Sequence, residues 1–244
     1  MIRVAAVADV HCGVDSAGRF RPHYEHLPEQ ADLFLIAGDL TRRGLADEAL
    51  VLARELEDVA ARVPTFAVLG NHDYHCDDQA IVAKVFDAAG IQVLEGESDT
   101  VEIDGHRVGV AGVKGFGGGF AGACGTEFGE PEMKAFVGHT RKVAGWLETS
   151  LLELATRDVA DVRIALMHYS PVEATLRGER PEIYPFLGSY LLAEAVDRAG
   201  ADLVVHGHAH GGSEKGVTPG GVHVRNVALP VINHAYNVYE LGQQ

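Results

Sequence analysis

Five short apolar segments in the sequence each run directly into residues that can bind a metal ion. The segments are residues 2–8, 32–37, 65–69, 162–167 and 203–206. Their lengths and compositions are typical of buried β-strands. The residues that follow them, in chain order, are Asp9-Val10-His11, Gly38-Asp39, Gly70-Asn71-His72-Asp73, His168 and Gly207-His208-Ala209-His210. This recurring order restricts the chain to folds that bring the ends of several strands together.

Helical patterns lie between the first of these strands. Residues 46–61 carry apolar side chains at helical spacing and stop before Pro64, and residues 79–89 repeat the pattern up to Gly90. Strands that alternate with helices favour parallel βαβ units. Because the carboxyl ends of parallel strands meet at one edge of a sheet, where ligands bind, we expect the five motifs to meet there.

The remaining segments predict antiparallel additions and further helices. Residues 100–104 and 107–113 flank an Asp-Gly turn, which is a strong hairpin signal. Helices are expected at 131–157 and 190–199, and two late antiparallel strands at 222–228 and 235–241. No linker or repeat divides the chain. The sequence therefore predicts a single α/β domain over residues 1–244, built on two packed sheets with helices outside.

Taken alone, each motif has a simpler structural explanation. Asp-x-His occurs by chance, Gly-Asp is usually a turn, and Asn-His-Asp after a strand can cap a helix. A buried His168 would more often be a core histidine with satisfied hydrogen bonds. Five such motifs in order, all at strand ends, are hard to attribute to chance. The combination therefore favours a shared functional site.

The ordered set resembles the calcineurin-like metallophosphoesterase superfamily, whose pattern is D-x-H, G-D, G-N-H-D/E, H and G-H-x-H. Every motif is present here, and together they span residues 9–210. The resemblance implies a two-layer mixed β-sandwich flanked by helices, with a binuclear metal centre. It also implies an enzyme that hydrolyses phosphate esters, with phosphodiesters favoured over monoesters by similarity to small members of the family.

The resemblance assigns roles to the motif residues. One metal would be held by Asp9, His11, Asp39 and His210. The other would be held by Asp39, Asn71, His168 and His208, so Asp39 would bridge the two ions. A hydroxide between the metals would attack phosphorus while His72, oriented by Asp73, acts as the general acid. Imidazole and oxygen ligands without thiolate suit two divalent ions of manganese, iron or zinc.

The acidic composition limits the partners. Asp and Glu number 35 against 20 Lys and Arg, which gives a formal charge of -15. Such a surface repels long polyanions, so no non-specific nucleic-acid binding is expected. A small phosphate ester that faces two buried cations stays compatible with this charge. A DNA or RNA nuclease, and a non-catalytic scaffold that uses the same fold, are the alternative functions.

The sequence also carries signals about location. No apolar stretch approaches the length of a membrane span, and the N-terminal segment lacks a signal-peptide pattern. The three cysteines form no disulfide framework. We therefore expect a cytoplasmic protein that does not bind membranes, while the oligomeric state is not predicted.

Residues near the motifs are candidates for substrate contact. They are Arg42, Tyr74, His75 and Arg180, with His23 and His26 as further candidates for the substrate entrance. The segments 112–125, half of which is glycine, and 170–188, which holds three prolines, are candidate lids over the site.

Overall fold

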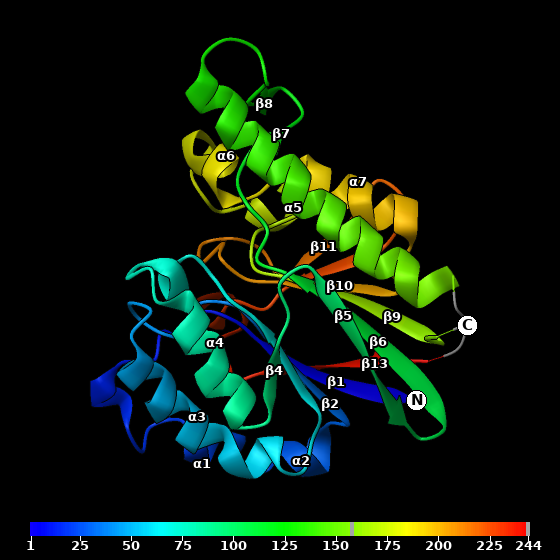
Figure 1. Ribbon diagram of the computed structural model, residues 1–244. Coiled ribbons are helices and arrows are strands. Elements are labelled where there is room, and N and C mark those ends of the chain that lie inside the picture. The colour runs from blue at the N-terminus through cyan, green and yellow to red at the C-terminus, as the bar shows by residue number, and fades with distance from the viewer. Residues whose placement is uncertain (157–158, 243–244) are drawn as a thin grey trace.

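Two β-sheets pack face to face at the centre of the protein, and helices cover their outer faces (Figure 1). The computed structural model describes residues 1–156 and 159–242. The first sheet has the strand order β13-β1-β2-β3-β4. Its strands are β1 (Ile2–Val7), β2 (Leu33–Ala37), β3 (Thr65–Val68), β4 (Ile91–Val93) and β13 (Asn237–Leu241). Strands β1 to β4 are parallel, and β13 joins β1 antiparallel.

The second sheet has the order β11-β12-β10-β9-β6-β5. Its strands are β5 (Glu97–Ile103), β6 (His106–Val113), β9 (Val162–Met167), β10 (Leu203–His206), β11 (Lys215–Val217) and β12 (His223–Asn226). Strands β6, β9, β10 and β12 are parallel, and β5 and β11 are antiparallel at the two edges. The mixed two-sheet α/β architecture is therefore confirmed.

Helices cover each sheet on its outer side (Figure 1). Beside the first sheet lie α1 (Arg21–Tyr24), α2 (Leu27–Gln30), α3 (Ala46–Ala60) and α4 (Gln79–Ala88). Beside the second lie α5 (Pro131–Thr156) and α7 (Tyr190–Ala199). The expected helices agree with α3, α4, α5 and α7, although residue 157 of the expected 131–157 helix lies outside the described residues. No helix in the described ranges has the length and apolar character that a membrane crossing requires.

The late strands differ from the expectation. Segments 222–228 and 235–241 contain β12 and β13, but these strands belong to different sheets. Strand β12 runs parallel to β10, and β13 runs antiparallel to β1. The short helix α8 (Leu229–Ile232) between them carries the chain from one sheet to the other. The short strands β4 and β11 escaped prediction because three residues are too few to show a periodic pattern.

The two candidate lids pack against each other. Segment 112–125 contains the end of β6 and the short pair β7 (Gly119–Phe120) and β8 (Ala123–Cys124). Segment 170–188 contains η3 (Glu173–Leu176), η4 (Pro181–Ile183) and α6 (Tyr184–Leu187). The amides of Gly118 and Gly119 donate to the carbonyls of Pro185 and Gly188 at 2.7 and 2.9 Å. Both segments are therefore parts of one hydrogen-bonded layer rather than two free loops.

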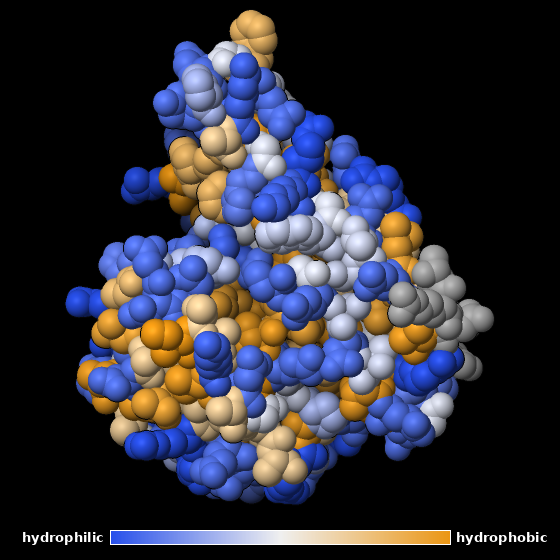
Figure 2. Space-filling model, viewed as in Figure 1, coloured by the Kyte–Doolittle hydropathy of each residue, from blue (hydrophilic) through white to orange (hydrophobic). Residues whose placement is uncertain are grey.

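The surface reflects this layering. Figure 2 shows hydrophobic residues gathered over α3 and α4, while hydrophilic residues cover much of the rest of the face. The same view shows a hollow between the α4 side and the α6 side of the molecule. The carboxyl ends of β1, β2, β3, β9 and β10 point toward this end of the sheets, as the parallel pairing requires (Figure 1).

Candidate metal centre

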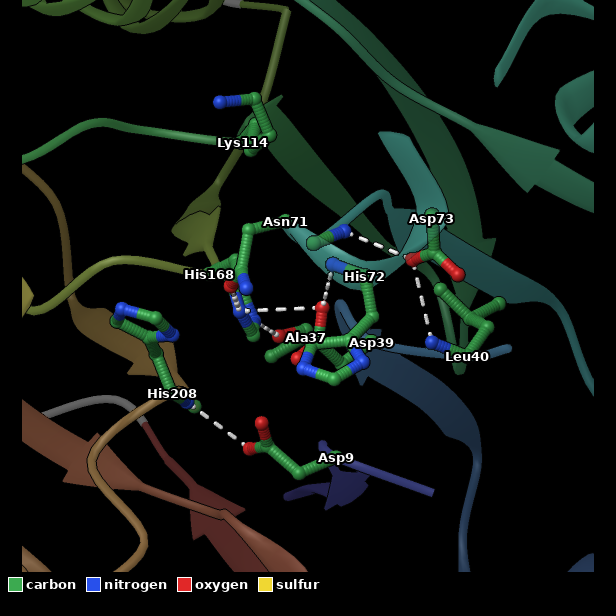
Figure 3. Close-up of polar contacts among 12 residues, drawn as sticks. Asp9, Ala37, Asp39, Leu40, Asn71, His72, Asp73, Lys114, His168 and His208 are labelled. Carbon is green, nitrogen blue, oxygen red and sulfur yellow. Dashed lines mark hydrogen bonds and ion pairs between the residues drawn. The ribbon is translucent and has the colours of Figure 1, made fainter. Parts of the chain in front are cut away.

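The structure brings the strand-end motifs of both sheets together. Three overlapping groups have side-chain nitrogen and oxygen atoms within 4.8 Å of one another. They are Asp9, His11 and His210; His11, Asp39 and His72; and Asp39, His168 and His208. Figure 3 shows the side chains of Asp9, Asp39, Asn71, His168 and His208 converging from separate strand ends. All seven residues expected to ligate metals therefore lie in one cluster.

The backbone of the cluster is unusual. Asp9, His11, Asp39 and His208 have φ angles of 59°, 47°, 50° and 70°, in the left-handed region that non-glycine residues rarely occupy. The amides of Asp9 and His11 donate to the carbonyls of Gly38 and Asp39, both at 3.0 Å, so the turns after β1 and β2 hold each other. Strained backbone of this kind persists where the surrounding structure fixes it, and it gathers at functional sites.

Two glycines allow the strand ends to approach closely. A Cβ on Gly70 would lie 2.1 Å from an Asp39 carboxylate oxygen, and a Cβ on Gly207 would lie 2.5 Å from an Asp9 carboxylate oxygen. Any side chain at these positions would push a carboxylate out of place. The Gly-Asn-His-Asp and Gly-His-x-His motifs therefore begin with glycine for a steric reason.

The first half of the cluster surrounds Asp9, which is almost completely buried. One Asp9 carboxylate oxygen lies 2.9 Å from His210 Nε2 and 4.0 Å from His11 Nε2, and the other accepts from the His208 amide at 2.9 Å. Nε2 of His11 is buried and has no hydrogen-bond partner within the described ranges. An imidazole nitrogen in this state is costly unless an ion or ligand satisfies it.

The second half of the cluster surrounds Asp39. Its Oδ2 lies 3.7 Å from His11 Nε2, and its Oδ1 lies 3.4 Å from His168 Nε2. The carboxylate of Asp39 therefore lies between the two halves. Nδ1 of His168 donates to the Ala37 carbonyl at 2.8 Å, which fixes the ring and directs Nε2 toward Asn71 Oδ1, 3.0 Å away, where a shared metal ion would be ligated.

The ionisation of these groups suits a cation. Burial lowers the pKa of His11, and it lowers the pKa of His208 to about 3, so both rings are neutral near pH 7. Burial alone would raise the pKa of Asp9, but the hydrogen bond from His210 and the charges of His168 and His210 outweigh it and keep Asp9 ionised. The same hydrogen bond raises the pKa of His210, so an ion bound there would displace the proton that His210 donates to Asp9. Neutral imidazoles and ionised carboxylates are the forms that ligate metals. The donor set and the unpartnered His11 nitrogen therefore fit divalent ions.

The ring of His72 is held by the Arg42 carbonyl and not by Asp73, the partner that was expected. Nδ1 of His72 donates to the Arg42 carbonyl at 2.8 Å, and the His72 amide donates to Asp39 at 2.8 Å. The carboxylate of Asp73 instead accepts from the amides of Leu40, Thr41 and Gly70 at 2.8–3.2 Å. Figure 3 shows the contact with Leu40. The family resemblance implied that Asp73 orients the His72 ring, but η2 (His72–Tyr74) turns Asp73 into the core. Asp73 joins the turns after β2 and β3.

The four candidate substrate residues lie in different places. Arg42 pairs with Asp15 at 2.8 Å and lines a cavity beside His11. The Tyr74 hydroxyl points toward Glu95, at 3.5 Å. His75 and Arg180 are exposed, and Arg180 directly precedes η4. Of these four, the structure thus places Arg42 at the edge of the cluster.

Sequence reasoning missed Lys114, which is only 8% exposed. Its ammonium lies 5.0–5.2 Å from the ring centres of Tyr74, Phe116 and Tyr169. Its carbonyl accepts from the amide of His168 at 3.0 Å. Figure 3 shows it above Asn71 and His168. The signal was available, since Lys114 directly follows strand β6, but the surrounding glycines suggested a loop.

Comparison with known proteins gives one family match. The family model described as calcineurin-like phosphoesterase matches residues 2–212. No curated protein matches the chain.

Solved structures with the same fold are distant in sequence. A phosphopantetheinyl hydrolase from Mycobacterium tuberculosis has a TM-score of 0.63 and 15% identity, with 98% of each chain covered. Protein TT1561 of Thermus thermophilus has a TM-score of 0.60 and 19% identity, with 92% of this chain and 88% of that chain covered. A putative 5′-nucleotidase from Staphylococcus aureus has a TM-score of 0.55 and 16% identity, with 92% of this chain but 48% of that chain covered. At these identities the likeness concerns the fold.

Proposed function

Because the chain belongs to the calcineurin-like phosphoesterase family, whose members are metal-dependent hydrolases of phosphate esters, we propose that it hydrolyses phosphodiesters at a two-metal centre. The observation that carries the proposal is Asp39, whose two carboxylate oxygens face His11 on one side and His168 on the other. A single carboxylate between two sets of imidazoles is the arrangement that a bridged pair of cations needs.

The two proposed ligand sets share Asp39. The first consists of Asp9, His11, Asp39 and His210, and the second of Asp39, Asn71, His168 and His208. Manganese, iron and zinc all match these oxygen and imidazole donors. Bound there, two divalent ions would supply Lewis acidity toward the phosphate oxygens and lower the pKa of a nearby water.

Hydrolysis forms one bond from a water oxygen to phosphorus and breaks one bond from phosphorus to the alcohol oxygen, which takes up a proton. We assign the delivery of that proton to His72. Its ring centre lies 4.5 Å from that of His11, and the Arg42 carbonyl holds Nδ1. Since Nδ1 is held, the proton for the leaving oxygen would come from Nε2.

The proposal is tested with bis-p-nitrophenyl phosphate, p-nitrophenyl phosphate and cyclic nucleotides, each assayed with Mn²⁺, Fe²⁺ and Zn²⁺. We expect the diester to be hydrolysed fastest. We expect His72→Ala to lower kcat by about 10²-fold or more, and Asp39→Asn to lower both activity and bound metal. Asp104→Asn is the matched control, because Asp104 also has a positive φ but lies in an exposed turn. Full diesterase activity in both site variants would refute the mechanism.

Two other functions are separated by simple assays. A nuclease would nick plasmid DNA and bind it in a salt-dependent way, whereas we expect neither from a chain with a formal charge of -15. A non-catalytic scaffold would hold no metal at neutral pH and stay inactive after Mn²⁺ addition. The intact set of donors around Asp39 supports the catalytic alternative.

A further inference from the structure

A cavity of about 700 Å³ opens beside His11, outside the ligand cluster. Its wall comes from three parts of the chain: residues 10–24, Arg42 and residues 229–235. The volume is that of a site for a small organic molecule. His11 belongs to both the cavity and the cluster, and Arg42 joins them through its carbonyl bond to His72. The cavity therefore adjoins the ligand cluster at His11.

The lining residues of the cavity are basic rather than acidic, in contrast to the chain as a whole. Its wall contains Arg19, Arg42, His23 and His234, and none of the described lining residues is acidic. In a chain with 35 acidic and 20 basic residues, a lining that contains two arginines and no acidic residue departs from the average composition. Guanidinium groups bind phosphate oxygens through paired, charge-assisted hydrogen bonds. This wall fits an anionic group better than a neutral one.

The Arg42 side chain is positioned before any ligand arrives. Its guanidinium lies against Gly13, where an added Cβ would fall 2.6 Å from the Arg42 Cζ atom. It also pairs with Asp15 at 2.8 Å, and both side chains of this pair are substantially exposed. Because an exposed ion pair contributes little, a phosphate can replace Asp15 as the partner at small cost.

Helix α3 holds the loop that carries Arg19 in place through Glu55. The buried carboxylate of Glu55 accepts hydrogen bonds from the amides of Gly18, Phe20 and Arg21 at 2.8, 3.0 and 2.9 Å. The negative charge of Glu55 is therefore directed toward these three backbone amides. The residues on either side of Arg19 are thereby held, so this wall is preorganised.

The rest of the wall is apolar. Phe20, Leu229 and Pro230 line the cavity and keep part of their surface accessible. An aromatic ring and two aliphatic side chains beside two guanidinium groups suit an organic group joined to a phosphate. A bare inorganic anion would leave this apolar surface uncovered.

We propose that this cavity binds the second phosphate and the attached organic group of a pyrophosphate-linked substrate of the nucleoside diphosphate class. The inference rests on the proposed function, because the scissile phosphorus lies at the ligand cluster. Water oxygen bonds to that phosphorus and the bond to the bridging oxygen breaks. The bridging oxygen stays on the second phosphate, which Arg19 and Arg42 hold, and two phosphate monoesters result.

The first test compares two inhibitors of bis-p-nitrophenyl phosphate hydrolysis that differ by one phosphate-like group. These are AMP and adenosine 5′-(α,β-methylene)diphosphate, which cannot be cleaved at its bridge. We expect the methylene diphosphate to inhibit the wild type about tenfold more strongly than AMP does, which corresponds to about 1.4 kcal/mol. Arg19→Gln with Arg42→Gln should bring the ratio of the two inhibition constants close to one. Arg141→Gln, which removes an arginine on α5, should keep the wild-type ratio.

The second test removes the metals, because diphosphates also bind metal ions directly. Calorimetric titration of the EDTA-treated protein should show binding of the methylene diphosphate to the wild type and to Arg141→Gln, and its loss in the double variant. A wild type that binds AMP and the methylene diphosphate equally, or a double variant that keeps the difference, would overturn the inference. Absence of diester hydrolysis with every metal would instead refute the proposed function, while the titration would still test the cavity.

Discussion

At the level of single residues, Asn71 sets the charge of the proposed metal centre. Two divalent ions would bring four positive charges, and Asp9 and Asp39 two negative ones, while Asn71 would ligate through a neutral carbonyl oxygen. The Asn71 oxygen lies 3.0 Å from His168 Nε2, within the second half of the cluster. A carboxylate of the same shape would cancel part of the charge that attracts a phosphate.

We predict that Asn71→Asp raises the KM for bis-p-nitrophenyl phosphate by about tenfold, because one positive charge of the centre is lost. Metal content, measured by plasma mass spectrometry, should not fall, since carboxylates bind divalent ions at least as well as amides. Asn237→Asp adds the same charge on β13, beside Ala6, and should leave KM unchanged. An unaltered KM in Asn71→Asp would show that the charge balance does not control substrate binding.

The sequence predicted the residues of the cluster but not all their contacts. Ligand types at strand ends are a local signal, so Asp9, Asp39 and His168 could be found without coordinates. The contacts of Asp73 and the aromatic surroundings of Lys114 could not be predicted, because each depends on how separate turns of the chain are oriented relative to one another. The Arg42 carbonyl behind His72 is a backbone group, which no side-chain pattern can reveal.

At the level of elements, Glu55 connects α3 to the loop after β1 through three backbone amides. Burial alone would raise the pKa of Glu55, but these hydrogen bonds outweigh it and hold the pKa below its ordinary value of 4.5. A lowered pKa means that the folded protein favours the ionised form. The resulting stabilisation is complete above pH 4.5 and is lost as the pH falls through the lowered pKa.

We predict that Glu55→Gln lowers the free energy of unfolding by about 2 kcal/mol at pH 7. The glutamine side chain has one oxygen and one NH₂ group, so a donor would face backbone donors and hydrogen bonds would be lost. The difference from wild type should stay constant between pH 7 and pH 5 and shrink below pH 4.5. Urea denaturation of metal-free protein at several pH values measures it. Glu57→Gln, on the exposed side of the same helix, should change stability little. A difference that grows on acidification would contradict this explanation.

The packed layer formed by β7, β8 and α6 gives a second prediction at this scale. Gly119 and Gly122 both have positive φ angles, of 94° and 86°. A Cβ on Gly119 would lie 2.1 Å from the Ala123 carbonyl oxygen, whereas one on Gly122 would meet nothing within 4 Å. Both alanine variants therefore carry the conformational cost, but only one carries a steric clash.

We expect Gly122→Ala to lower the free energy of unfolding by about 1 kcal/mol and Gly119→Ala by at least about 2 kcal/mol more. Gly119→Ala should also open the layer to limited proteolysis within residues 117–125. Thermal denaturation and digestion of both variants give the comparison. Equal effects would mean that the segment is a free loop in solution and not part of the layer.

At the level of the whole molecule, the sequence predicted two packed sheets but not the path of the chain between them. Alternation of strand and helix in the first half of the chain pointed to the parallel strands β1, β2 and β3, but β4 was missed and β12 was expected to be antiparallel. The transfer of the chain from β12 to β13 depends on α8, a four-residue helix with no periodic pattern. Pairing between distant strands depends on the shape of the assembled core, so the order β13-β1 could not be derived from either segment alone.

The two sheets share one core, which supports a single folding unit. Val110 and Leu166 of the second sheet belong to the same buried cluster as Val7 and Ile36 of the first. Leu94, next to β4, contacts Gly112 of β6 so closely that an added Cβ would fall 2.5 Å away. Neither sheet can leave the other without exposing this surface to water.

We therefore predict one cooperative unfolding transition for metal-free protein in urea. Fluorescence of Trp146, the single tryptophan, reports on α5 beside the second sheet, and circular dichroism reports on the whole chain. Their transitions should coincide. Leu94→Ala should shift both midpoints together and lower the free energy of unfolding by about 2–5 kcal/mol. Leu152→Ala, on the more exposed side of α5, should shift them far less. If Leu94→Ala separated the two transitions, the sheets would be independent domains joined by a weak interface.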